Sequence, residues 1–262
     1  QGILSRQCFA GMAGPPRPFV NDFDCGSGEG SGCLSVAPEG IRTPAFGLKF
    51  NKGVSGKNLL AVADEEGYIS ILDCRGHLPD EEAPYHGEES SGNRAWVRSS
   101  WQAHYNAVFD VTWTEDDRSV LTASGDQSMG LFDVETQEEV AIFRGHTGSV
   151  KSISQKPGSS HIFASGGRDG AVMLWDQRVH STASDAQSTP VLSPVHVIPN
   201  AHVVHELQRR RGRRPGIQGE SKQSVTSVLF LGVDGLLASA GAADGVVKLW
   251  DVRQLSCPAA LL

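Results

Sequence analysis

Apolar and polar residues follow the same pattern in four twelve-residue segments, each of which ends in aspartate. The segments are "VADEEGYISILD" (62–73), "TASGDQSMGLFD" (122–133), "SGGRDGAVMLWD" (165–176) and "AGAADGVVKLWD" (240–251). Each begins with small residues, passes through a polar turn and then alternates apolar and polar positions. Seven positions before the final aspartate stands an acidic residue, and these are Glu66, Asp126, Asp169 and Asp244. A short strand, a turn of this composition and a period-2 strand predict a β-hairpin.

A small residue followed by histidine precedes three of these hairpins. The pairs are Ala103-His104, Gly145-His146 and Ala201-His202, and the strand-like stretches "AVFDVTW", "SVKSIS" and "SVTSVLF" come after them. The period is 43 residues between Asp133 and Asp176. Units of this length with three or four strands are typical of WD repeats. The sequence therefore predicts an all-β protein, a WD-repeat β-propeller present as an incomplete arc of about four blades.

The polar residues of each unit suggest a hydrogen-bonded chain from loop to strand to turn. In the third unit His146, Ser165, Asp169 and Trp175 are expected to satisfy one another, because indole only donates and carboxylate only accepts. The corresponding residues elsewhere are His104, Thr122 and Asp126 in the second unit and His202 and Asp244 in the fourth. Two positions depart from the pattern: Phe132 replaces tryptophan, and Ala240 replaces the hydroxyl residue.

A histidine, a hydroxyl residue and an aspartate also resemble a hydrolase triad. Because the trio recurs in successive units, a structural role is favoured over catalysis. Other chemical motifs fail: "NKGVSGKN" (51–58) lacks the first glycine and the final Ser or Thr of a phosphate-binding loop. The five cysteines include no C-x-x-C pair, so we expect reduced thiols and no metal site. No catalytic residue and no cofactor are predicted.

Charge is distributed unevenly along the chain. The formal charge is −7, yet residues 205–222 carry five arginines and one lysine against two glutamates. An acidic body with one basic insertion is not expected to bind nucleic acid directly. No run of 18 apolar residues occurs, so no membrane span is predicted.

The domain organisation follows from where the repeats stop. Residues 1–43 are rich in Gly, Ser and Pro and are predicted to be a flexible N-terminal segment. Residues 44–262 are assigned to the propeller blades, with insertions at 76–95 and 179–222.

Two units end in Trp-Asp-x-Arg. The residues are Trp175, Asp176 and Arg178 in the third unit and Trp250, Asp251 and Arg253 in the fourth. Each arginine falls in the loop after the last predicted strand, on the face opposite the Asp-Gly turns. Two interpretations remain open: each arginine pairs locally with an acidic neighbour, or the two arginines form a docking surface for a partner.

This repeated Trp-Asp-x-Arg box resembles the one by which propeller substrate receptors dock on the damage-specific DNA-binding adaptor of cullin-4 ubiquitin ligases. Over residues 44–254 the chain is similar to the denticleless-type receptor. The similar stretches are "PAFGLKF", "LAVADEEGYISILD", "WQAHYNAVFDVTW", "LTASGDQS", "SGGRDGAVMLWDQR" and the segment that ends in "LASAGAADGVVKLWDVR". That family carries seven blades, so about four of seven are expected here.

The resemblance implies a non-catalytic substrate receptor in the nucleus. Its partners would be the adaptor and degron-bearing replication and cell-cycle proteins on proliferating cell nuclear antigen. The two boxes would bind the adaptor, and the opposite face would meet the degron, where Asp64, Glu65 and Glu66 either attract a basic residue or form a solvated turn. The alternative is a generic WD scaffold in a chromatin or RNA assembly.

The basic cluster "RRRGRR" (209–214) is predicted to be a solvent-exposed loop. Five arginines cannot pack into a core without leaving buried charge unpaired. Three roles compete: a solvated spacer, a nuclear-import signal and a nucleic-acid contact. Import is favoured because short basic clusters are read in that way, and its residues are Arg209, Arg210, Arg211, Arg213 and Arg214.

Overall fold

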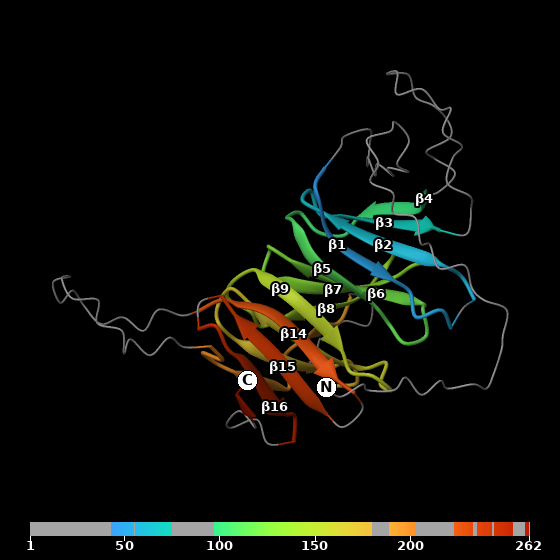
Figure 1. Ribbon diagram of the computed structural model, residues 1–262. Helices are drawn as coiled ribbons and strands as arrows, with labels where there is room; N and C mark the ends of the chain where they lie inside the picture. Colours follow the sequence, from blue (N-terminus) through green and yellow to red (C-terminus); the bar gives the residue numbers. More distant parts are fainter. Residues whose placement is uncertain are drawn as a thin grey trace, which may run out of the picture.

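Every regular element that the structure describes is a β-strand. The computed structural model describes residues 43–54, 56–74, 97–179, 189–202, 223–232, 235–242, 244–253 and 260–261. The strands form four sheets of antiparallel neighbours, with one short parallel strand added to the second sheet. The predicted all-β propeller fold, present as an incomplete arc of four blades, is confirmed (Figure 1).

The four sheets follow one another along the chain, and each reads as one blade. Sheet 1 contains β1 (Ala45–Phe50), β2 (Leu59–Asp64), β3 (Tyr68–Asp73) and β4 (Val97–Gln102). Sheet 2 contains β5 (Val108–Trp113), β6 (Ser119–Ser124), β7 (Ser128–Asp133), β8 (Glu139–Arg144) and β12 (Val191–Leu192). Sheet 3 contains β9 (Val150–Gln155), β10 (Ile162–Gly167), β11 (Val172–Asp176) and β13 (His196–Ile198). Sheet 4 contains β14 (Val225–Leu231), β15 (Leu236–Gly241), β16 (Val247–Asp251) and β17 (Ala260–Leu261).

The repeated twelve-residue segments form the second and third strands of each sheet. Their turns need a left-handed residue, and glycine supplies it at Gly67 (φ 93°), Gly170 (φ 79°) and Gly245 (φ 68°). In sheet 2 the corresponding left-handed residue is Gln127, with φ 74°. The acidic residue of the sequence pattern thus marks the turn in all four hairpins, and a glycine follows it in three of them.

Successive sheets pack face to face, with their first strands as neighbours at the centre of the arc. Side chains also tie the first strands together: Trp113 Nε1 donates to the Lys49 carbonyl at 2.9 Å, and Ile153 N donates to Asp110 Oδ2 at 2.9 Å. The Ser154 hydroxyl accepts from Phe230 N at 3.0 Å. These bonds fix the stagger between neighbouring blades.

Three apolar cores lie between the four sheets. The largest buried side chains are Trp113 with Ile69 between sheets 1 and 2, Phe143 with Trp175 between sheets 2 and 3, and Trp250 with Phe230 between sheets 3 and 4. The run V-M-L-W in β11 is apolar at every position because both faces of sheet 3 are covered.

The outward face of sheet 4 carries apolar side chains that none of the other three sheets covers. Leu229, Leu231 and Val247 are exposed on the face opposite the core with sheet 3. In β1 the side chains of Phe46, Leu48 and Phe50 are exposed as well.

Several predicted segments lie outside the described residues, or partly so. Residues 1–42, the insertion 76–95 and the basic cluster 209–214 are not described. Within the predicted insertion 179–222, residues 189–202 contain β12 and β13, so this stretch is not one continuous interruption of the blades.

Candidate functional site

The third unit contains an unbroken line of hydrogen bonds that joins four side chains. His146 lies in the loop between β8 and β9, and its Nδ1 is 2.9 Å from Asp169 Oδ2 in the β10–β11 turn. Its Nε2 is 2.7 Å from the Ser165 hydroxyl of β10. The indole Nε1 of Trp175 in β11 donates to the same hydroxyl at 2.8 Å.

The chemistry of the four groups fixes where the protons lie. The indole donates to the Ser165 oxygen, so the serine proton is directed to His146 Nε2, and the Nδ1–H donates to Asp169. The carboxylate also accepts from Thr147 N at 2.8 Å and Ala171 N at 3.1 Å. The Ser165 oxygen is thus enclosed between two ring systems, which suits a structural tie between the β8–β9 loop and sheet 3 and not a nucleophile.

In the second unit the same three positions come together without an indole. His104 Nδ1 lies 2.8 Å from Asp126 Oδ2, and its Nε2 lies 2.7 Å from the Thr122 hydroxyl. The backbone N–H of Gly130 donates to that hydroxyl at 3.3 Å in place of the missing indole, and the Gly130 carbonyl lies 3.0 Å from the hydroxyl as a further acceptor. Phe132 instead contacts the His104 ring edge-on, with 6.1 Å between ring centroids.

The fourth unit corrects the sequence alignment. The prediction that Ala240 replaces the hydroxyl residue is wrong, because Ser239 lies 2.8 Å from His202 Nε2 and accepts from Trp250 Nε1 at 2.8 Å. Asp244 pairs with His202 Nδ1. Ten positions separate Ser165 from Trp175, but eleven separate Ser239 from Trp250. The β15–β16 turn holds the additional residue, which a gapless comparison of sequences cannot show.

Hydrogen bonds lower the pKa of the aspartates in the second and third units. Burial on its own raises the pKa of Asp126, but hydrogen bonds from His104 and Ser128 outweigh it and lower the pKa to about 2. For Asp169 the same opposition of burial and the His146 hydrogen bond lowers the pKa. The side chain of Asp169 is 7% exposed and that of Asp126 is 33% exposed.

The two Trp-Asp-x-Arg boxes adopt the same geometry on sheets 3 and 4. Arg178 donates from Nε to Asp176 Oδ1 at 2.9 Å and from Nη2 to Asp176 Oδ2 at 2.6 Å. Arg253 makes the same two bonds to Asp251, at 2.9 and 2.8 Å. In each box the backbone N–H of the arginine also bonds the aspartate. In this structure each arginine therefore pairs with the aspartate of its own box, as the first of the two interpretations expects.

Local pairing does not bury these arginines. The side chains of Arg178 and Arg253 are 64% and 75% exposed. The hydrogen bonds from each arginine lower the pKa of Asp176 and of Asp251 to about 2, so both forks are charged at neutral pH. An exposed guanidinium held by a two-bond fork has a fixed direction.

The tryptophans of the boxes lie in the cores and not on the rim. Trp175 is 1% exposed and Trp250 is 4% exposed. Each indole fills the space between two sheets and donates a hydrogen bond to a serine, so the exposed side chains of the boxes are those of the arginines. That the boxes bind the adaptor stays a prediction. Sheet 2 lacks the fork: its Asp133 bonds the backbone N–H groups of Glu135 and Thr136.

The acidic turn of sheet 1 divides into two parts. Asp64 is buried, and its carboxylate accepts from Glu66 N at 3.0 Å, Tyr68 N at 2.8 Å and the Thr43 hydroxyl at 2.8 Å. Asp64 therefore holds the turn, whereas Glu65 and Glu66 are exposed.

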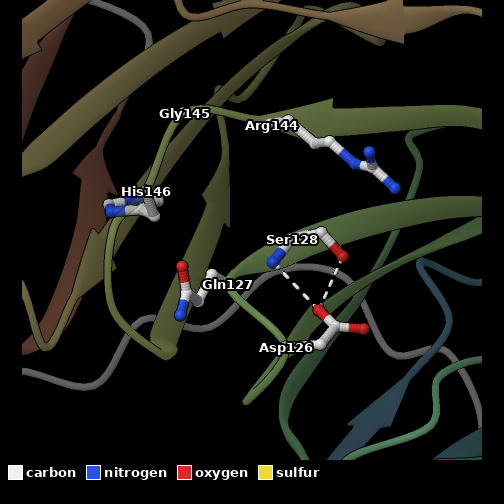
Figure 2. A pocket seen from close by; sticks show the side chains of 6 residues that line it. All are labelled: Asp126, Gln127, Ser128, Arg144, Gly145 and His146. Carbon is white, nitrogen blue, oxygen red and sulfur yellow. Dashed lines mark hydrogen bonds between the residues drawn. The ribbon is translucent and has the colours of Figure 1, made fainter.

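A polar hollow of about 340 Å³ lies beside the β6–β7 turn of sheet 2 and the β8–β9 loop (Figure 2). It is lined by Asp126, Gln127, Ser128, Arg144, Gly145 and His146. Asp126 is engaged by Ser128, as the dashed lines show, and the His146 ring bonds Asp169 and Ser165. Asp126 and His146, the two residues of the lining that could do acid–base chemistry, are thus already engaged by other side chains.

The described part of the chain offers no sign of metal chemistry or of a membrane-crossing helix. Among those residues no group of three or more His, Cys, Asp or Glu side chains is arranged to hold a metal ion. No helix there is long and apolar enough to cross a membrane.

Sequence reasoning missed Ser239 and three residues at the centre of the arc, Phe46, Phe109 and Lys151. The last three occupy the second position of β1, β5 and β9 in register with one another. Aligning the first strands of the units would have placed them side by side, because those strands are neighbours at the centre.

Comparison with known proteins agrees with the fold. A model of the WD domain, G-beta repeat, matches residues 96–133, 137–176 and 215–251. The denticleless protein homologue of Danio rerio is 35% identical over 221 residues, which are 84% of this chain and 31% of that protein. The human homologue is 30% identical over 92% of this chain and 31% of its own length.

A more distant relative shows the same extent of similarity. The protein lethal(2)denticleless of Drosophila melanogaster is 32% identical over 85% of this chain and 27% of that protein. The chain therefore spans about a third of the length of the curated relatives that it matches. Together with the WD-repeat matches, these relatives show that the chain is a denticleless-type WD-repeat protein.

Proposed function

We propose that this chain is the propeller region of a non-catalytic substrate receptor of a cullin-4 ubiquitin ligase. The observation that carries the proposal is the repeated Asp-Arg fork on two neighbouring blades, Asp176–Arg178 and Asp251–Arg253. The membership of the denticleless family supports it. The substrates would be degron-bearing proteins bound to proliferating cell nuclear antigen.

The geometry of the forks explains how such a surface would bind. The arginines extend from the ends of β11 and β16, which lie in sheets that pack against each other. Each aspartate holds its guanidinium in one orientation before binding, so less side-chain entropy is lost on docking. Arginines at a desolvated interface are among the residues that contribute most to affinity.

The forks and the hydrogen-bonded chains lie at opposite ends of the same strands. In sheet 3, β11 runs from the Asp169 turn to Asp176. The adaptor and the substrate would therefore occupy opposite faces of the arc, with the substrate on the face of the turns. No chemical step is assigned to the chain, because the three His–hydroxyl–Asp sets are engaged in holding neighbouring elements together.

The test is co-precipitation of the purified chain with the damage-specific DNA-binding adaptor. The double variant Arg178→Ala and Arg253→Ala should lose adaptor binding, since each such arginine contributes about 2 kcal/mol. The matched control is Arg118→Ala, an exposed arginine in the β5–β6 loop at the same end of sheet 2. Its adaptor binding should be unchanged.

Thermal denaturation separates binding from folding in this experiment. Because both guanidinium groups are exposed, the double variant should melt within about 3 °C of the unchanged chain. Undiminished co-precipitation by a folded double variant would remove the support for the ligase and leave the generic WD scaffold as the better interpretation.

Nuclear import through the basic cluster is a separate part of the proposal. The five arginines at 209–214 are Arg209, Arg210, Arg211, Arg213 and Arg214, and short clusters of this kind are read by import receptors. Replacing all five by glutamine in a fluorescently tagged chain should move the protein from nucleus to cytoplasm without loss of adaptor binding. Retention in the nucleus would contradict the import role.

A further inference from the structure

An aromatic and cationic stack crosses three blades at the centre of the arc. Phe46 of β1 stacks on Phe109 of β5, with ring centroids 5.6 Å apart and an angle of 7° between the ring planes. Lys151 of β9 places its Nζ 3.1 Å from the centroid of the Phe109 ring. Each residue is the second of its strand, so the three side chains lie at one level near the end where the hairpin turns gather.

The stack remains open to solvent. The Phe46 side chain is 46% exposed, whereas the aromatic side chains in the three cores between the sheets are buried. Tyr105, in the loop just before β5, is exposed as well. A parallel pair of phenylalanine rings that ends in solvent is a surface on which another apolar or aromatic side chain can stack.

The charge beside the stack is positive over sheet 3. Burial, followed by the nearby Arg168, lowers the pKa of Lys151. In the part of the chain that the structure describes, neither Lys151 nor Arg168 forms an ion pair with a carboxylate. The neighbouring Asp169 is committed to His146. Lys151 and Arg168 together therefore present positive charge that no described carboxylate neutralises, and such a surface favours an anionic ligand.

We propose that Phe46, Phe109, Lys151 and Arg168 form a binding site for an acidic peptide segment that carries an aromatic side chain. The aromatic side chain stacks on the exposed Phe46 ring, and the peptide carboxylates lie over Lys151 and Arg168. This inference deepens the proposed function by naming a substrate class, and rests on it only in taking the peptide to be the substrate.

The experiment measures fluorescence polarisation of labelled pentapeptides titrated with the full chain. The probe is Asp-Asp-Phe-Glu-Glu, and the matched controls are Lys-Lys-Phe-Lys-Lys and Asp-Asp-Ala-Glu-Glu. The first control reverses the charge and keeps the ring, and the second keeps the charge and removes the ring. We expect the probe to bind at least about tenfold more tightly than either control, with affinity that falls as salt is added.

Three variants test the residues. Lys151→Glu with Arg168→Glu should weaken probe binding about tenfold, and Phe46→Ala should weaken it about fivefold. The control is Lys156→Glu, a lysine just after the other end of β9, which should leave the affinity unchanged. All three variants should retain adaptor co-precipitation, so failure here is distinct from failure of the proposed ligase role.

Each contrary result overturns the inference. It is refuted if the probe does not bind, if the basic peptide binds equally well, or if the charge reversal leaves probe binding intact. Binding of oligodeoxythymidylate in preference to the probe would assign the stack to single-stranded nucleic acid instead. A variant with an altered melting temperature is replaced by Lys151→Gln, which removes the charge with a smaller change.

Discussion

Removing Asp169 should strongly destabilise the chain, because its carboxylate accepts hydrogen bonds from three groups of the third unit. In Asp169→Ala, His146 Nδ1 loses its acceptor, and so do the backbone N–H groups of Thr147 and Ala171. The imidazole is almost fully buried, so water cannot replace the carboxylate there. The loop between β8 and β9 then loses its tie to the β10–β11 turn.

The magnitude follows from the contacts. A buried donor left without a partner costs about 1–3 kcal/mol, and a bond that water can replace costs about 0.5–1 kcal/mol. His146 belongs to the first group, and the two amides near the surface belong to the second. The free energy of unfolding should therefore fall by about 2–4 kcal/mol, which lowers the melting temperature by on the order of 10 °C in a chain of this size.

The matched comparison is Asp126→Ala in the neighbouring unit. Asp126 pairs with His104 in the same way, but its side chain is 33% exposed, and its other partners belong to the half-buried Ser128. Water can replace part of what is lost, so we expect a loss of about 1–2 kcal/mol. Urea denaturation followed by tryptophan fluorescence measures both variants, because Trp175 lies beside the third network.

Two results would refute this reasoning. Equal losses for the two variants would show that burial of the carboxylate does not set its contribution. A loss below 0.5 kcal/mol for Asp169→Ala, roughly that of an ordinary surface substitution, would show that the chain of bonds does not hold the blade. Asp169→Asn is the control for volume, since it keeps the size of the side chain and removes the charge.

Three further predictions test the register, a turn and the ionisation of the fold. Ser239→Ala should cost about 2–4 kcal/mol because it strands His202 and Trp250, whereas Ala240→Ser should stay within about 0.5 kcal/mol by urea denaturation. Gly67→Ala should lower the melting temperature far more than Gly245→Ala, since a Cβ at Gly67 would meet the His104 carbonyl, and nothing lies within 4 Å of one at Gly245. Because the folded pKa of Asp126 is lowered to about 2, its stabilising effect is complete above about pH 4 and is lost as the pH falls toward 2. Melting curves across that range should be flatter in Asp126→Ala, and an identical acid transition would contradict the assignment.

The sequence by itself determined the features that depend on short-range patterns. The hairpins follow from alternation and from turn residues such as Asp169 and Gly170, because a turn's geometry is set by the few residues within it. The recurrence of His104 and His146 ahead of the hairpins likewise revealed the blades. The family was also recognised from the sequence, because the Trp-Asp-x-Arg box is a run of consecutive residues that can be identified before any contact is known.

Only the tertiary structure decided how residues far apart in the chain meet. Ser239 and not Ala240 bonds His202 because one additional turn residue shifts the register, and side chains along a strand alternate between faces. The stacking of Phe46 on Phe109 joins positions 63 residues apart, and it depends on the packing of two sheets. Burial of Trp175, like the fork that orients Arg178, is also a property of packed blades, because exposure and direction are set by neighbours that no local pattern specifies.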